Sequence, residues 1–328
     1  MVDEMGKPVL QARAEINKAI GHCKFYEQNS ELFLKPESIN LGDTPATVNV
    51  LYQPIGPLLI IMPWNFPFWL PFKCIIPQFA LGNTILLKHA PCVPQCAEAI
   101  EDLLIKAGLE NVYQNLYLNT EDTEYAISHN NVKGVAFTGS TRAGKVIGGL
   151  SGKYLKKCVL ELGGSDPFIV LEDADISDAV TKGIMSRTMN SGQACINAKR
   201  FILHENVYDE FKEKLIEQVK ALKVGDPSTQ STKIGPLARI DLYENLQKQV
   251  NSALDQGATL VHGNTDQLEN PVNPENGLYF PPTIIEDISE NNIAYKDELF
   301  GPVFSLYKVD SEEEAIRLGK LSSKSNFL

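Results

Sequence analysis

One cysteine of this chain stands where its thiol could meet a substrate. Cys195 ends a run of small and polar residues, 190–194, and does not lie on an apolar face. Gly192 in this run permits a sharp turn and a close approach of the backbone to a ligand. A thiol on such a turn can be tuned towards the thiolate and can attack an electrophilic carbon. The alternative, a small buried cysteine beside a turn, is the more common case for an isolated cysteine.

Three further stretches supply groups that such a nucleophile needs. They are Pro63-Trp64-Asn65-Phe66-Pro67, Glu161-Leu162-Gly163-Gly164 and Glu298-Leu299-Phe300-Gly301-Pro302. The amide of Asn65 could stabilise an oxyanion, but Asn65 could equally be a turn residue between two prolines. Glu161 is flanked by apolar residues, so it could be partly buried and act as a general base. Its alternative is a solvated charge at a strand end.

Five motifs in this order resemble those of the aldehyde dehydrogenase superfamily. They cover nearly all of the chain and comprise residues 63–67, 137–140, 161–164, 192–195 and 298–302. Within that superfamily, the segments 87–91 and 161–168 are most similar to bacterial succinate-semialdehyde dehydrogenases. The resemblance implies NAD(P)-dependent oxidation of an aldehyde to the carboxylic acid, with succinate semialdehyde as the candidate substrate.

The resemblance also implies a role for each catalytic residue. Cys195 would attack the aldehyde to form a thiohemiacetal, while the Asn65 amide and the Cys195 N–H hold the oxyanion. One such donor is typically worth ~3–4 kcal/mol of transition-state stabilisation. After hydride transfer to the nicotinamide, Glu161 would activate the water that hydrolyses the thioester.

The cofactor region lacks a Gly-x-Gly-x-x-Gly motif. Its nearest equivalent is the stretch 137–144, in which a strand leads through glycine and hydroxyl residues into a helix. Backbone N–H groups at a helix start can bind phosphate, although Ser140 as a plain N-cap is equally consistent. The resemblance assigns the following residues to the cofactor: Pro63, Trp64, Lys88, Phe137, Gly139, Ser140, Leu162, Glu298 and Phe300.

The choice between NAD and NADP depends on the segment after Lys88. Pro91 stands where many NAD-preferring members of the superfamily carry a carboxylate. That carboxylate would bind the ribose 2′-hydroxyl and repel a 2′-phosphate. We therefore expect NADP to be usable. Glu298, expected at the nicotinamide ribose, could instead be a surface acid beside a Gly-Pro turn. Arg187 is the candidate cation for a substrate carboxylate, and its alternative is a solvent-facing helix residue.

Alternating strands and helices must position these groups. Short apolar runs predict strands at 58–62, 84–88, 112–118, 132–137 and 157–162, with helices at 95–107, 121–127 and 141–150. Such βα repeats predict a doubly wound parallel sheet with its ligand site at the strand carboxyl ends. Asn65, Lys88, Ser140 and Glu161 all fall at or just after those ends.

The second half of the chain repeats this style with different elements. Strands are predicted at 167–171 and 200–204, and helices at 176–189, 207–222, 241–256 and from 312 onwards. A polar stretch, 264–277, predicts a surface loop. We therefore expect an α/β dinucleotide-binding domain, 1–162, followed by a second α/β catalytic domain, 163–328.

The resemblance has consequences for assembly as well. It assigns a hairpin near 43–55 to contacts between subunits and implies a homo-oligomer. The family chain continues beyond both ends of this one, so we expect this chain to be truncated and its catalytic domain to be incomplete. That expectation puts the oligomer in doubt.

Composition narrows the class of protein. The 328 residues carry 30 basic and 41 acidic side chains, a net charge of −11, which argues against nucleic acid or a membrane surface as partner. No apolar run approaches the roughly 20 residues that span a bilayer. Six cysteines in a chain of this length predict no disulfide framework and favour a cytoplasmic location. Cys92 and Cys96 are the only close pair, so no metal site is expected.

Three other functions remain open at this point. The chain could be an inactive, truncated remnant of the same fold. It could be a relative that uses coenzyme A in place of water, although a base such as Glu161 would be superfluous for thiol release. It could be a cysteine hydrolase, although none of the five histidines stands in a motif that would pair with Cys195.

Overall fold

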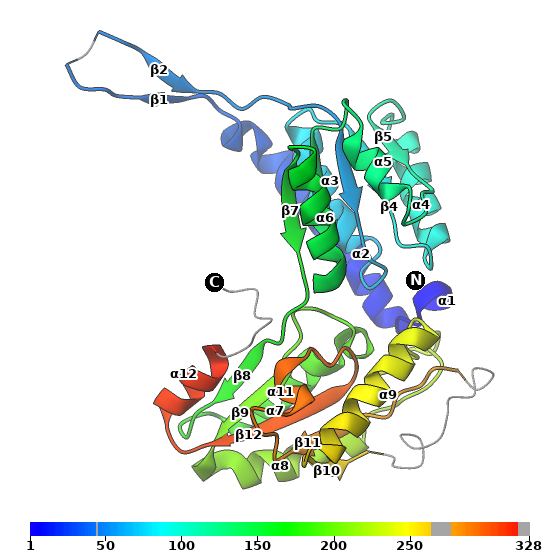
Figure 1. Cartoon of the computed structure of the whole chain (residues 1–328), viewed down its shortest axis with the longest axis vertical. Coiled ribbons are helices and arrows are strands. Elements are labelled where there is room, and N and C mark those ends of the chain that lie inside the picture. The colour runs from blue at the N-terminus through cyan, green and yellow to red at the C-terminus, as the bar shows by residue number, and fades with distance from the viewer. Residues whose placement is uncertain (44, 264–276, 321–328) are drawn as a thin grey trace. The chain divides into compact units, whose positions relative to one another are not determined.

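The computed structural model describes residues 1–43, 45–263 and 277–320. The chain forms two compact units (Figure 1). The central unit is Arg13–Leu162, and the terminal unit combines Met1–Ala12 with Gly163–Leu328. The surface loop expected at 264–277 lies outside the described residues, apart from its last residue.

The central unit is built on a five-stranded parallel sheet. Its strands are β3 (Leu58–Ile61), β4 (Ile85–Lys88), β5 (Tyr113–Asn115), β6 (Gly134–Thr138) and β7 (Lys157–Glu161). They lie in the order β5-β4-β3-β6-β7, and every neighbouring pair is parallel. The chain therefore builds outwards from β3 in one direction and then in the other. This order confirms the predicted doubly wound sheet.

Helices cover both faces of this sheet. Ile60 of β3 packs with α3 (Trp69–Ala80) and α4 (Pro94–Lys106), whereas Leu59 and Ile61 pack with α5 (Thr123–Ser128) and α6 (Thr141–Lys153). Successive strand residues point to opposite faces, so a strand with helices on both sides must be apolar throughout. The continuous apolar run at 58–62 has this cause.

The beginning of the central unit differs from the expected pattern. The hairpin expected near 43–55 contains β2 (Val48–Val50), which pairs antiparallel with β1 (Glu37–Ile39), a strand that the sequence did not reveal. Helix α3 was not predicted either, because Pro71 and Pro77 interrupt its apolar run. Pro71 stands in the first turn, where proline costs a helix no hydrogen bond.

The terminal unit holds a second five-stranded sheet. Its strands are β8 (Pro167–Val170), β9 (Arg200–His204), β10 (Thr259–His262), β11 (Thr283–Glu286) and β12 (Val303–Val309). The order is β10-β11-β12-β9-β8, with all pairs parallel except β10 with β11. The last three of these strands in the sequence had not been predicted. The second α/β fold itself is confirmed.

The helices of the terminal unit largely follow the predictions. They are α1 (Val2–Met5), α7 (Ile176–Thr188), α8 (Glu205–Lys220), α9 (Ile240–Asp255), α11 (Ile293–Lys296) and α12 (Glu312–Lys320). The long helix α2 (Val9–Phe33) starts in this unit and continues into the central one. Among the described residues, no helix combines the length and apolar character that crossing a bilayer requires.

Candidate active site

In the central unit, the expected residues gather at one edge of the sheet. Lys88 and Glu161 end β4 and β7, Gly139 and Ser140 follow β6, and Asn65 follows β3. Because these strands are parallel neighbours, their carboxyl ends share that edge. The central sheet thus brings together the chemistry-bearing residues of three of the five motifs and Lys88 of the segment 87–91.

The turn after β6 is suited to an anion. Ser140 is the N-cap of α6, and its hydroxyl accepts a hydrogen bond from the backbone N–H of Ala143 at 3.3 Å. The first turn of this 13-residue helix contains no acid, so its exposed N–H groups favour a negative charge. At Gly144, a Cβ would collide with Leu162, so the glycine lets α6 lie close to that residue. The observed cap and a phosphate site are compatible, because each uses different N–H groups.

A small cavity lies beside the end of β4. It has a volume of about 220 Å³, and its lining includes His89, Pro91 and Asn115. None of the described residues that line it carries a carboxylate. Lys88 precedes His89 and is buried, and this burial lowers the pKa of its ammonium group. Because no carboxylate of the described lining faces the cavity, a phosphate would meet no like charge there.

Asn65 and its neighbours form a buried turn. Trp64 and Asn65 are both buried, which is compatible with either interpretation of Asn65. The following helix, α3, is fixed by Glu15 of α2, whose carboxylate accepts hydrogen bonds from the N–H groups of Phe68 and Trp69 at 2.8 and 2.9 Å. A carboxylate at a helix start stabilises that helix and holds the turn before it.

Glu161 has a partner that the sequence did not suggest. The ammonium of Lys73, in the first half of α3, lies 3.1 Å from Oε1 of Glu161. The two side chains are 43% and 55% exposed, so the expected partial burial of Glu161 was wrong. Such an exposed pair contributes at most about 1 kcal/mol to folding and mainly orients the carboxylate. Lys73 is the only charged residue of the helix WLPFKCIIPQFA, and this was the signal that could have revealed the pair.

In the terminal unit, Cys195 lies in the segment 189–199 between α7 and β9, here called the thiol loop. The loop begins with a tightly held turn. Asn190, Ser191 and Gly192 all have positive φ, at 54°, 56° and 79°. For the two residues with side chains this backbone conformation is strained. At Gly192, a Cβ would also collide with the backbone of Gly301, so both conformation and space require glycine.

Hydrogen bonds from distant segments hold this turn. The N–H of Asn190 donates to the side chain of Gln11 at 2.6 Å, and the N–H of Gly235 donates to the hydroxyl of Ser191 at 2.9 Å. Gln193 accepts from the N–H of Ala238 at 3.0 Å. Cys195 follows this scaffold and is only partly buried. The fully buried alternative for this cysteine is therefore not what the structure contains.

Arg187 is placed differently from its expected role. Its side chain is fully buried, and Nε donates to the carbonyl of Val303 at 2.6 Å, while NH2 donates to the carbonyls of Leu299 and Gly301. Burial lowers the pKa of this guanidinium to about 9. Arg187 holds the 299–303 turn together, which argues against both a solvent-facing position and a role as the substrate cation.

Glu298 belongs to a buried ion pair with Lys199. The Lys199 ammonium lies 2.6 Å from Oε1 of Glu298, and the two side chains are only 3% and 16% exposed. Burial raises the pKa of Glu298 and lowers that of Lys199, and the attraction within the pair partly opposes both shifts. Glu298 is therefore not a surface acid. Lys199 was missed because nothing in its sequence surroundings indicates which carboxylate it meets.

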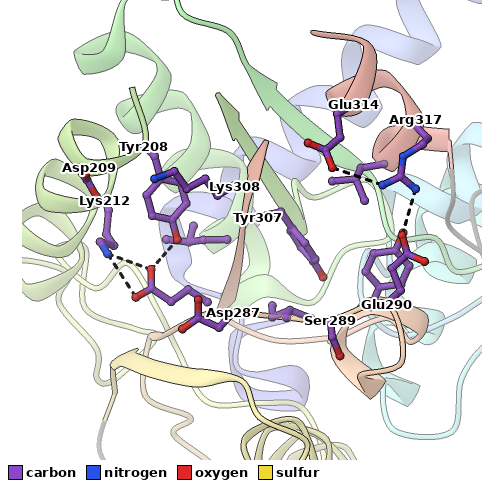
Figure 2. Close-up of a pocket in the computed structure, with 15 residues that line it drawn as sticks. Tyr208, Asp209, Lys212, Asp287, Ser289, Glu290, Tyr307, Lys308, Glu314 and Arg317 are labelled. Carbon is purple, nitrogen blue, oxygen red and sulfur yellow. Dashed lines mark hydrogen bonds and ion pairs between the residues drawn. The ribbon is translucent and has the colours of Figure 1, made fainter. Parts of the chain in front are cut away.

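A separate cavity of about 550 Å³ lies in the terminal unit and is lined by residues of α8, β12 and α12, among others (Figure 2). Two of its cations form ion pairs: Lys212 with Glu286 at 3.1 Å, and Arg317 with Glu290 at 3.1 Å. The described lining includes none of the expected site residues. The lining carries five carboxylates and three cations, and it includes no residue of the thiol loop.

Comparison with known proteins identifies the family of this chain. A family model for the aldehyde dehydrogenase family matches residues 1–320, and the chain belongs to this family. Among curated relatives, the NADP⁺ succinate-semialdehyde dehydrogenase of Deinococcus radiodurans is 42% identical over 321 residues, covering 98% of this chain and 66% of the relative. The succinate semialdehyde dehydrogenase [NAD(P)+] Sad of Escherichia coli is 40% identical, covering 96% and 67%.

A solved structure shares the fold closely. The succinic semialdehyde dehydrogenase of Streptococcus pyogenes, in complex with NADP⁺, superposes with a TM-score of 0.93 at 37% identity. The match covers 99% of this chain and 70% of the chain in that structure. The chain thus spans about two thirds of the length of the relatives that it matches.

Proposed function

We propose that this chain oxidises an aldehyde to the carboxylic acid with NADP⁺ or NAD⁺, and that succinate semialdehyde is the substrate. The observation that carries the proposal is the thiol loop, in which glycine geometry and distant hydrogen bonds hold a partly exposed cysteine. The names of the relatives support both the substrate and the cofactors.

The catalytic steps are assigned to this chain's own residues. The Cys195 thiol loses its proton to solvent, and the thiolate attacks the carbonyl carbon to form the thiohemiacetal oxyanion. The Asn65 amide and the backbone N–H of Cys195 stabilise the developing oxyanion. Glu161, oriented by Lys73, then takes a proton from the water that cleaves the thioester, which releases the acid and restores the thiol.

The cofactor is assigned to the carboxyl edge of the central sheet. The bound nicotinamide would supply the hydride acceptor for the step between thiohemiacetal and thioester. The acid-free first turn of α6, with Gly139 and Ser140, would hold the pyrophosphate. Lys88 and the carboxylate-free cavity beside it would accept the adenosine ribose and its 2′-phosphate. The remaining cofactor contacts are proposed for Pro63, Trp64, Phe137, Leu162, Glu298 and Phe300.

The division of labour follows the two units. We assign dinucleotide binding to the central unit and the nucleophile to the terminal unit. The hairpin of β1 and β2 is proposed to contact another copy of the chain, because its six strand residues are all exposed and include Ile39, Val48 and Val50. A cytoplasmic location is proposed from the cysteine content.

A panel of aldehydes tests the function. NADPH formation is measured with succinate semialdehyde and with an uncharged aldehyde of equal length, at one concentration of thiol reagent. Hydrolysis of an ester is measured separately. Preference for the semialdehyde supports the proposal. Ester hydrolysis without a dinucleotide, together with no oxidation of any aldehyde, would favour the cysteine hydrolase. Thioester formation that needs added coenzyme A would favour the acylating relative. Failure of every aldehyde, with dinucleotide binding retained, would favour an inactive remnant.

A further inference from the structure

The ammonium group of Lys199 joins three segments of the terminal unit. It lies 2.6 Å from the carboxylate of Glu298, donates to the carbonyl of Gly164 at 2.6 Å, and donates to the carbonyl of Cys195. Two of its three protons are thus donated to carbonyls, and its charge pairs with the carboxylate. Lys199 therefore holds the thiol loop, the 163–164 segment and the 298–302 turn at one point.

Burial makes this arrangement costly to disturb. The Lys199 side chain is only 3% exposed, and an ion buried to that degree is tolerated only when its partners replace its lost water. The glycine at position 163 belongs to the same construction, because a Cβ there would collide with the carboxylate of Glu298. The backbone of Gly164 also hydrogen-bonds to that carboxylate.

Four charged groups face one another here. The positive ones are Lys199 and Arg187, and the negative ones are Glu298 and, further out, Asp166. Lys199 is the cation that hydrogen-bonds directly to the cysteine residue, through the Cys195 carbonyl. A nearby cation stabilises a thiolate, and a carboxylate beside that cation weakens the effect.

We propose that Lys199 is a positioning residue of the thiol site, which fixes the Cys195 carbonyl and, together with Glu298, sets the reactivity of the thiol. The inference rests on the proposed role of Cys195 as the nucleophile. It goes further because it places the control of that thiol in a buried lysine that none of the five motifs includes. Because Lys199 and Glu298 carry opposite charges, removal of one or the other should shift the reactivity of the thiol in opposite directions.

The test measures alkylation of each cysteine by iodoacetamide as a function of pH, resolved by peptide mass spectrometry. In Lys199→Met, the cation is lost while the carboxylate remains. The midpoint of the Cys195 profile should rise by about one pH unit, and its rate at pH 7 should fall about tenfold. In Glu298→Gln, Lys199 keeps its proton through the two carbonyls and Asp166, and the midpoint should fall.

Two further variants guard against misfolding and against a purely structural effect. Lys199→Met combined with Glu298→Gln removes both buried charges, so its stability should exceed that of Lys199→Met alone, and its midpoint should return towards that of the unmodified protein. Lys199→Arg keeps the charge and should lie between the unmodified protein and Lys199→Met. As a matched control, Lys212→Met breaks a less buried ion pair of the same unit and should leave Cys195 alkylation unchanged.

Opposite shifts in the two single variants support the inference. Shifts of the same sign in both, or additive losses in the double variant, would mean that the pair only stabilises the fold, and would overturn it. The assay needs no turnover, so it separates the two proposals. Charge-dependent alkylation without NADP⁺ reduction would leave the inference standing and remove the proposed function. A Cys195 that reacts no faster than Cys158 would overturn both.

Discussion

The two sheets of this protein present their chemistry at opposite ends of their strands. In the central unit, Lys88, Ser140 and Glu161 stand at or just after the carboxyl ends of parallel strands. In the terminal unit, Cys195 and the 298–302 turn precede β9 and β12, and therefore lie at the amino ends of neighbouring parallel strands.

The difference shows two ways of building a site. At the carboxyl edge of the central sheet, the strands and a helix start define the positions, so that short local patterns are sufficient. At the amino edge of the terminal sheet, the thiol loop is held by partners such as Gln11, Gly235 and Gly301, which lie far away in the sequence. Variants that damage one edge and spare the other can separate these two constructions.

The largest expected effect belongs to the nucleophile at the amino edge. Cys195→Ser should reduce the rate of NADPH formation at least about a thousandfold, because the hydroxyl is a far weaker nucleophile at neutral pH. Dinucleotide binding, measured by calorimetry, should remain. Cys158→Ser is the control, since Cys158 is also partly buried but lies in β7. Near-normal turnover of Cys195→Ser would contradict the mechanism.

At the carboxyl edge, Glu161→Gln should separate two steps of the reaction. Removing the base should slow steady turnover about a hundredfold or more, while one equivalent of NADPH still forms in a burst, because hydride transfer precedes hydrolysis. Stopped-flow absorbance measures both phases. An equal loss of burst and steady rate would assign Glu161 to an earlier step. Lys73→Met should reproduce the defect in weaker form, since it only orients the carboxylate.

Substitution of one glycine in each unit tests how strongly the thiol loop depends on its tertiary partners. Gly192→Ala places a side chain at φ 79° against the backbone of Gly301 and should lower the free energy of unfolding by about 1–3 kcal/mol. Gly149→Ala lies inside helix α6 with nothing within 4 Å of the added Cβ, and should raise it by about 0.4–1 kcal/mol. Urea unfolding measures both. Equal effects would refute the contrast.

The smallest expected effect concerns cofactor choice at the carboxyl edge. Pro91→Glu introduces a carboxylate at the cavity beside Lys88 and should shift the ratio of NADP⁺ to NAD⁺ affinity about tenfold towards NAD⁺, by repulsion of the 2′-phosphate. Dissociation constants for both dinucleotides provide the measurement. A thousandfold preference for NAD⁺ in the unmodified protein would instead mean that another residue already repels the phosphate.

The sequence by itself determined the strands of the central sheet and the family. Apolar runs such as 58–62 identify a strand with helices on both faces, and motif residues at the strand ends identify the carboxyl edge, because both signals lie within a few consecutive residues. It was less informative where elements are short or interrupted. Strands β10 and β11, of four residues each, and the proline-containing helix α3 were missed for this reason, whereas β12, of seven residues, was missed although it is neither short nor interrupted.

Only the tertiary structure decided which charged side chains meet. Lys73 pairs with Glu161, Arg187 binds the carbonyl of a residue 116 positions further on, and Lys199 is buried against Glu298. No local pattern encodes such pairs, because each depends on how two distant segments pack. Because of this packing, Arg187 binds backbone carbonyls and is not available as a substrate cation. The same packing places the buried Lys199–Glu298 ion pair next to the Cys195 carbonyl.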